Sequence, residues 1–232
     1  MIGTLINVAA IVIGSCIGLL FRQGMKKPMT DTVMQGLGLC VMLIGFSGAL
    51  QTKNMLLVIL SMTVGGVLGA FLDIERRMNQ LGAYAQRKLS RDGENENNSF
   101  AKGFVTASLV FCVGAMAVVG ALDSGIRGDH STLIAKSALD CVAAMIFAGT
   151  MGIGVMLSAL PVLVYQGAIA LLGAGIAPLL GENVVLEMSA VGGLLIVGIG
   201  LNMLLDKDIK VANLLPAIFI PFAYFPIMSL FG

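Results

Sequence analysis

The chain has 232 residues, of which 57% are hydrophobic and 12% charged, and its mean hydropathy is +0.96. This balance excludes an ordinary soluble domain and predicts an integral membrane protein, with the lipid bilayer as its first partner. The net charge is +1 and the 14 Lys and Arg residues form no long block, so we expect no nucleic-acid partner.

Apolar runs long enough to cross about 30 Å of hydrocarbon as a helix recur along nearly the whole chain. Because backbone groups in lipid must be hydrogen-bonded internally, these runs favour an all-α, polytopic transmembrane helical bundle that forms a single domain, 1–232. We expect eight spans, at 2–21, 33–50, 55–72, 103–122, 135–157, 161–180, 188–205 and 211–230. The division at Leu160-Pro161 is the weakest, and without it seven spans would remain.

The first run has no basic segment before it and is longer than the core of a signal peptide, so we expect a retained span. With the N terminus outside, the inner loops carry eleven Lys and Arg residues and the outer loops carry three, namely Lys53, Arg127 and Lys136. Basic residues near span ends are held in the cytoplasm, so we predict both termini on the non-cytoplasmic side of a bacterial inner membrane.

The longest predicted loop, 74–101, lies on the cytoplasmic side and divides into two parts. In the first part, apolar residues at helical spacing from Ile74 to Leu89 alternate with basic ones, which is typical of an amphipathic helix lying on an anionic leaflet. The second part, RDGENENNS, is polar and fits either a solvated linker or a docking segment for a partner.

The fifth predicted span contains Asp140, four residues after Lys136, so both side chains project from one helix face. Charged groups at membrane depth are costly and usually face a cavity or a partner. Two interpretations stay open. Asp140 and Lys136 form an ion pair that anchors the helix end, or Asp140 takes up a proton or a monovalent cation.

Later in this span, the segment 150–154 has the T-x-G-x-G form of a potassium-channel filter. A filter needs a short pore helix before it, and a run of spanning length precedes Thr150 instead. Small residues at helical intervals favour close packing between helices. A second interpretation is a locally unwound helix whose backbone contacts a substrate at Thr150 and Gly152. A third is an ion channel that uses this segment.

Several neutral or acidic side chains fall in or near the other spans. Asn7, Gln166 and Asn202 are amides that either bond across to a neighbouring helix or jointly line a polar cavity with Asp140 and Thr150. Other acidic residues fall at span ends, where we expect water to reach them: Asp73, Glu182 and Glu187.

Internal similarity indicates two kinds of repeat. At an offset of 72 residues, 40–50 matches 112–122 and predicts a parallel repeat. A fainter match between spans one to three and six to eight pairs Asn7 with Gln166 and predicts an inverted repeat, which would let one site face each side of the membrane in turn.

The residues that commonly carry catalysis are sparse. The four cysteines lie in apolar runs without a C-x-x-C pair, and His130 belongs to no H-x-x-x-H group. We therefore expect no metal site, no cofactor and no enzymatic activity.

Three long segments carry a family resemblance: MIGTLINVAAIVIG, FCVGAMAVVGALDSGIRGDHSTLIAKSALD, and TMGIGV with the following YQGAI. Together they resemble the YdfK/YqgA-type family of bacterial inner-membrane proteins, a domain of unknown function, over nearly the full length. The resemblance implies at most a candidate transport protein and supplies no substrate or catalytic residue.

The first functional hypothesis is a transporter or permease that moves a small polar solute or an ion, a proton included, by alternating access around a mid-membrane polar cavity. Asp140, Thr150, Gly152, Asn7, Gln166 and Asn202 are its predicted substrate-binding residues. The alternative from another class is a non-transporting scaffold or sensor that forms a homo-oligomer through its glycine-rich helix faces.

Overall fold

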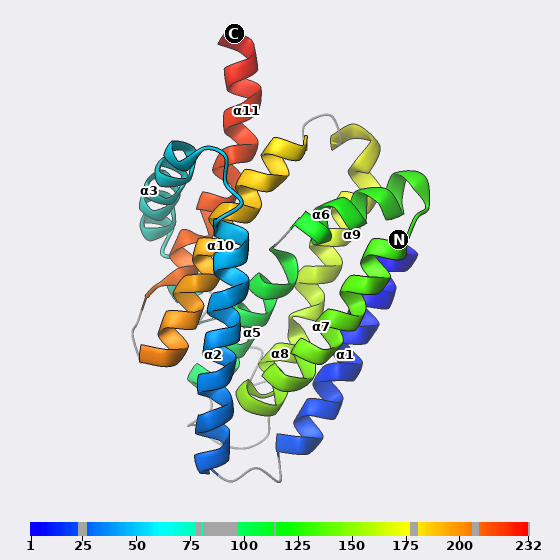
Figure 1. Cartoon of the computed structure of the whole chain (residues 1–232), viewed down its shortest axis with the longest axis vertical. Helices are drawn as coiled ribbons and strands as arrows, with labels where there is room; N and C mark the ends of the chain where they lie inside the picture. Colours follow the sequence, from blue (N-terminus) through cyan, green and yellow to red (C-terminus); the bar gives the residue numbers. More distant parts are fainter. Residues whose placement is uncertain are drawn as a thin grey trace.

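The computed structural model describes residues 1–22, 27–77, 80, 97–113, 115–176, 181–205 and 209–231, and in these ranges every regular element is a helix. The helices pack as a bundle (Figure 1). In chain order they are α1 (Ile2–Arg22), α2 (Lys27–Ala49), α3 (Met55–Leu72), α5 (Asn97–Cys112), α6 (Ala115–Leu122), the π-helix η1 (Asp123–Arg127), α7 (Ser131–Met151), α8 (Gly154–Leu157), α9 (Ala159–Ile176), α10 (Glu182–Leu205), the 3-10 helix η2 (Val211–Phe219) and α11 (Ile220–Phe231). The predicted all-α bundle is confirmed.

Six helical segments in the described part are long and apolar enough to cross a membrane. The number rises to seven if α5 and α6, which meet at an angle of 59°, form one bent span. The predicted eighth span, 211–230, is divided between η2 and α11, and its apolar helical part, Val211–Phe225, is shorter than the other six. Pro216 lies inside η2, where its missing N–H prevents a continuous α-helix.

The boundary between the fifth and sixth spans lies earlier than predicted. Helix α7 ends at Met151, and Gly152 has a φ of 86°, which favours glycine. Pro161 lies in the first turn of α9, where its missing N–H would have no helical partner. The carbonyl oxygens of Gly152 and Ile153 accept hydrogen bonds from Val155 N at 3.2 Å and Met156 N at 3.1 Å, so they do not form an open row for a cation.

The predicted interfacial helix within 74–101 falls mostly outside the described residues. Ile74–Arg77 are helical, whereas Met78, Asn79 and 81–96 are not described. Helix α5 begins at Asn97, so the last three residues of the segment predicted to be a polar linker are helical instead.

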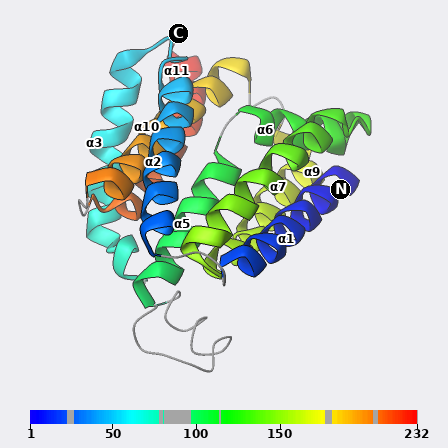
Figure 2. The ribbon, with the colours of Figure 1, turned by 60° about the horizontal axis from the view of Figure 1, so that its bottom comes forward.

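Helix α1 lies along α7, and α2 lies along α10 (Figure 2). Gly14 and Gly18 on α1 face the α7 backbone so closely that a Cβ atom at either position would overlap an α7 carbonyl oxygen. Gly65 and Gly69 face the backbone of η2 in the same way, and Gly193 faces that of α2. Close packing through small residues, one of the predicted interpretations, is confirmed at these three interfaces.

Glu187 differs from its prediction as a water-accessible residue at a span end, because its side chain is 1% exposed. Thr52 Oγ1 donates to Glu187 Oε2 at 2.6 Å, and the N–H groups of Lys53 and Asn54 donate to Oε1 at 2.8 and 3.0 Å. The Asn54 side chain in turn accepts from Leu57 N at 3.1 Å and caps α3. The Glu187 carboxylate therefore holds the turn that begins α3.

We expect Glu187→Gln to destabilise the folded protein by about 1–2 kcal/mol, because the amide keeps one oxygen to accept from the Lys53 and Asn54 N–H groups but loses the negative charge that strengthens these bonds and the oxygen that accepts from Thr52. Glu182→Gln on the same helix is the control, since Glu182 is exposed and its exchange should change stability by less than about 0.5 kcal/mol. Thermal unfolding of both purified variants, followed by circular dichroism, measures the difference. Equal stability of the two would show that the carboxylate does not support the turn.

Candidate functional site

Helices α1, α7 and α9 bring four polar side chains together inside the bundle: the predicted site residues Asn7, Asp140 and Gln166, and Lys136, which pairs with Asp140. Asn7 is 0% exposed, Gln166 0%, Lys136 5% and Asp140 6%. Asn7 Nδ2 donates to Asp140 Oδ2 at 3.0 Å and lies 3.4 Å from Gln166 Oε1. Lys136 Nζ donates to the same Asp140 oxygen. We call Asn7, Lys136, Asp140 and Gln166 the polar cluster.

The ion pair in the polar cluster is formed within one helix. Lys136 and Asp140 are four residues apart on α7, which places their side chains one above the other on the face turned toward α1. Both are buried, so each charge has lost much of its hydration and depends on the other for compensation. Removing one partner would leave the other as an uncompensated buried charge.

The polar cluster retains unused hydrogen-bonding capacity. Asn7 Oδ1 and Gln166 Nε2 are buried and have no hydrogen-bond partner among the described residues. The same is true of Thr4 Oγ1, one turn before Asn7 on α1. Buried polar groups are nearly always paired with protein, water or a ligand. An acceptor and a donor beside the Asp140 carboxylate are therefore left for a bond that the described protein atoms do not supply.

Polar groups continue from the polar cluster toward the start of α7. The α1 backbone at Gly3, the residue before Thr4, lies close to the buried Ser124 hydroxyl, because a Cβ atom added at Gly3 would be 3.2 Å from Ser124 Oγ. Ser124 Oγ is 2.9 Å from His130 Nδ1. Beside His130, Asp129 Oδ1 accepts from Ser131 N at 2.9 Å, and this bond lowers the pKa of the exposed Asp129 carboxyl.

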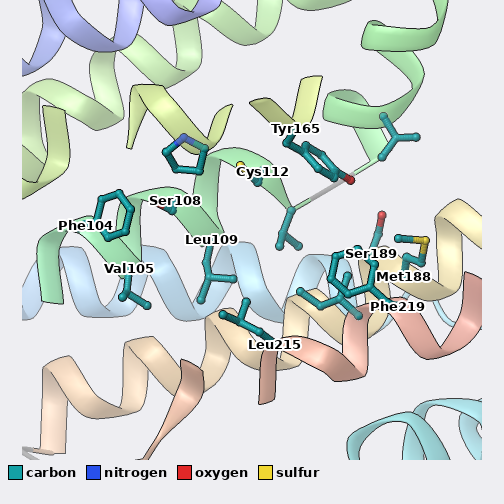
Figure 3. Close-up of a pocket in the computed structure, with 14 residues that line it drawn as sticks. Phe104, Val105, Ser108, Leu109, Cys112, Tyr165, Met188, Ser189, Leu215 and Phe219 are labelled. Carbon is teal, nitrogen blue, oxygen red and sulfur yellow. The ribbon is translucent and has the colours of Figure 1, made fainter. Parts of the chain in front are cut away.

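A cavity of about 250 Å³ lies next to the polar cluster, between α5, α9, α10 and η2 (Figure 3). We call it the apolar cavity, because most of its 14 lining residues are aliphatic or aromatic. Cys112 and Tyr165 lie in its wall, and Tyr165 directly precedes Gln166 of the polar cluster on α9. Asp140 and Thr150 are not lining residues. The apolar cavity therefore approaches the polar cluster without containing its carboxylate.

Three predicted site residues lie elsewhere. Thr150 Oγ1 donates to the carbonyl oxygens of Ile146 and Phe147 within α7, at 3.1 and 3.0 Å. Gly152 ends α7. Asn202 Nδ2 donates to Ile209 O at 2.8 Å and its Oδ1 accepts from Ile209 N at 2.9 Å, so this amide fixes the connection between α10 and η2. We find no contact of these residues with the polar cluster in the described part of the chain.

Two neighbours that shape the site, Thr4 and Cys112, were not predicted from the sequence. Thr4 carries a weak signal, because it is three residues before Asn7 and so shares its face of a helix. Cys112 has no signal beyond its place in an apolar run. Among the described residues, no group of three or more His, Cys, Asp or Glu side chains is arranged to hold a metal ion.

Comparison with known proteins places this arrangement in a family. The family model described as "Protein of unknown function (DUF554)" matches residues 2–225. The chain is 32% identical over 236 residues to "Uncharacterized membrane protein YdfK" of Bacillus subtilis (strain 168), which covers 100% of this chain and 99% of that protein. It is also 32% identical over 219 residues to "Uncharacterized protein YqgA" of Escherichia coli (strain K12), covering 94% of this chain and 93% of that protein. No solved structure matches the chain.

The likeness to both relatives extends along almost the entire length of the chain. With a family match from residue 2 to residue 225, the chain belongs to the DUF554 family of proteins of unknown function and is a polytopic membrane protein.

Proposed function

We propose that this protein transports a small polar solute or a monovalent cation across a bacterial cytoplasmic membrane, and that Asp140 exchanges a proton or cation during the cycle. The supporting observation is a carboxylate that is 6% exposed between helices of spanning length, beside two amides with unused hydrogen-bonding atoms. Ionisable groups in membrane helices are expensive, and they commonly mark the path of an ion or substrate.

The proposed cycle depends on the competition for Asp140. In the present conformation Lys136 and Asn7 both donate to Asp140 Oδ2. A proton or cation that reached Asp140 would replace Lys136 as the compensating charge, and Lys136 would then need water or another partner. That exchange favours a different packing of α7 against α1 and α9. Asn7 Oδ1 would accept from the solute and Gln166 Nε2 would donate to it.

The inverted repeat is part of the proposal. Asn7 and Gln166 are paired by that repeat, and their side chains lie 3.4 Å apart. Two equivalent residues that touch must both lie beside the pseudo-twofold axis that relates them. A polar cluster on such an axis in the membrane plane would be reached equally from both sides in an alternating-access cycle.

The proposed orientation places both termini on the non-cytoplasmic side, following the distribution of Lys and Arg. Contacts between loops assigned to the same side support the order of the spans, and the direction follows from the Lys and Arg residues. Thr52 bonds to Glu187 at one end, whereas Asn213 bonds to Glu75 N at 2.8 Å at the other. The route from His130 through Ser124 and Thr4 would then open to the non-cytoplasmic side.

Flux into proteoliposomes tests the transport proposal. The purified protein is reconstituted with the pH-sensitive dye pyranine inside, a pH gradient is imposed, and NaCl, KCl, LiCl or choline chloride is added outside. We expect at least one alkali cation to dissipate the gradient at least tenfold faster than in protein-free vesicles, and choline to have no effect. Rates equal to those of empty vesicles for every salt would reject cation–proton exchange and favour a scaffold.

The same assay separates the polar cluster from the residues that lie outside it. Thr150→Val keeps the size of the side chain and removes only hydroxyl bonds made within α7. We expect its flux to stay within about twofold of the unchanged protein. A complete loss of flux would return the 150–154 segment to the transport path.

A further inference from the structure

The apolar cavity differs in chemistry from the polar cluster. We propose that it binds a neutral molecule about the size of a substituted benzene ring that carries one hydroxyl group. The proposal concerns binding and holds whether or not the protein transports a cation.

The size of the apolar cavity sets the size of its ligand. Its volume is about 250 Å³. A cavity of roughly 150 Å³ lined by aliphatic and aromatic side chains stays dry and admits benzene, so this larger one has room for a ring with a substituent. Phe104 and Leu109 from α5, Met188 from α10 and Leu215 from η2 supply apolar surface for the ring.

The lining excludes ions and strongly polar molecules. Among the described residues that line the apolar cavity, none is charged. An ion would lose its hydration there without a compensating partner, which costs far more than a neutral hydroxyl does. The buried charges of Lys136 and Asp140 on α7 are compensated by each other. A neutral ligand is therefore the class that this cavity accepts.

The hydroxyl groups of Tyr165 and Ser189 offer hydrogen bonds for one ligand hydroxyl at one end of the apolar cavity, and Ser108, whose buried Oγ has no hydrogen-bond partner among the described residues, lines it separately. Figure 3 shows the Tyr165 hydroxyl turned toward the side on which Ser189 lies, while Phe104 and Val105 lie at the opposite end. Ser189 Oγ donates to Val185 O at 2.7 Å, so its lone pairs remain available to accept. A ligand hydroxyl would accept from Tyr165 and donate to Ser189.

Two fluorinated probes test the proposal. The full-length protein is placed in lipid nanodiscs, and its binding of 4-fluorophenol and of fluorobenzene is titrated by ¹⁹F NMR relaxation, with empty nanodiscs as the blank. Tyr165→Phe removes the hydroxyl and keeps the ring. We expect it to weaken binding of 4-fluorophenol by about tenfold, the value of one hydrogen bond, and to change binding of fluorobenzene by less than twofold.

Two further variants complete the test. Leu109→Trp fills the cavity and should abolish binding of both probes. Tyr224→Phe is the matched control, because Tyr224 packs edge-on against Phe225 in α11, outside the cavity. Gel filtration and circular dichroism verify that each variant is folded. No binding above the empty nanodiscs, or equal loss of both probes in Tyr165→Phe, would overturn the proposal.

Discussion

Asp140→Asn is expected to reduce cation-driven proton flux in proteoliposomes to the level of protein-free vesicles, a loss of at least tenfold. Asparagine preserves the shape of the side chain and its contact with Asn7 but cannot take up a proton or neutralise a cation. In the proposed cycle that exchange is the coupling step, so the loss should appear in the rate with every cation that the unchanged protein accepts.

The same substitution leaves Lys136 as an uncompensated charge that is only 5% exposed. Breaking a buried pair in this way typically costs about 3–5 kcal/mol, so unfolding is a second route by which the variant loses flux. Replacing both partners, as Lys136→Met with Asp140→Asn, removes the buried charges together. The double variant should recover most of the lost stability, because replacing a buried pair by neutral groups is often close to neutral.

The two variants together make the transport proposal falsifiable. The double variant should be as stable as the unchanged protein to within about 1 kcal/mol and should still show no flux. If it transports at the normal rate, Asp140 is a structural partner of Lys136 and has no part in coupling. Unfolding in detergent and flux in vesicles are measured on the same preparations, so stability and activity are compared directly.

The sequence identified most of the polar cluster because polar side chains are rare in apolar runs. Asp140, Asn7 and Gln166 all stand out on that basis, and the spacing of Lys136 and Asp140 predicts their shared face. The contacts among helices could not be predicted in this way. Asn7 is 133 residues from Asp140 and 159 from Gln166, and hydropathy contains no information about which distant faces meet.

The search for polar side chains in or near apolar runs also selected residues that have other roles. Asn202 looks like Asn7 in the sequence, but the Ile209 backbone lies within reach and satisfies its amide. Glu187 was expected in water because it is close to a span end, yet the turn at 52–54 covers it. In each case a backbone segment outside the residue's own helix decides its role, and hydropathy does not show where that segment lies.

Gly18→Ala is expected to lower stability by about 3 kcal/mol, which corresponds to a fall of about 6–12 °C in the thermal midpoint of a chain of this size. The added Cβ would overlap the carbonyl oxygen of Met145 on α7, and a backbone atom cannot move aside as a flexible side chain does. Helices α1 and α7 must therefore separate. Circular dichroism during heating of the detergent-solubilised protein measures the change.

Gly36→Ala provides the matched control on α2. A Cβ atom there meets nothing within 4 Å, so alanine should raise stability by about 0.5–1 kcal/mol through its higher helix propensity. If Gly18→Ala lowers the free energy of unfolding and Gly36→Ala raises it, these helices tolerate alanine in general. The glycine at position 18 is then explained by its close contact with α7. If Gly18→Ala is also stabilising, the tight α1–α7 contact is not present in the folded protein.

This packing determines the geometry of the polar cluster as well. Asn7 is carried by α1 and Asp140 by α7, and their hydrogen bond of 3.0 Å depends on how closely those two helices approach. A separation forced at Gly18 or Gly14 would lengthen that bond while changing no polar side chain. Folded Gly18→Ala protein, kept below its thermal midpoint, should therefore lose flux in proportion to the loosened Asn7–Asp140 contact, whereas folded Gly36→Ala protein should transport at the normal rate.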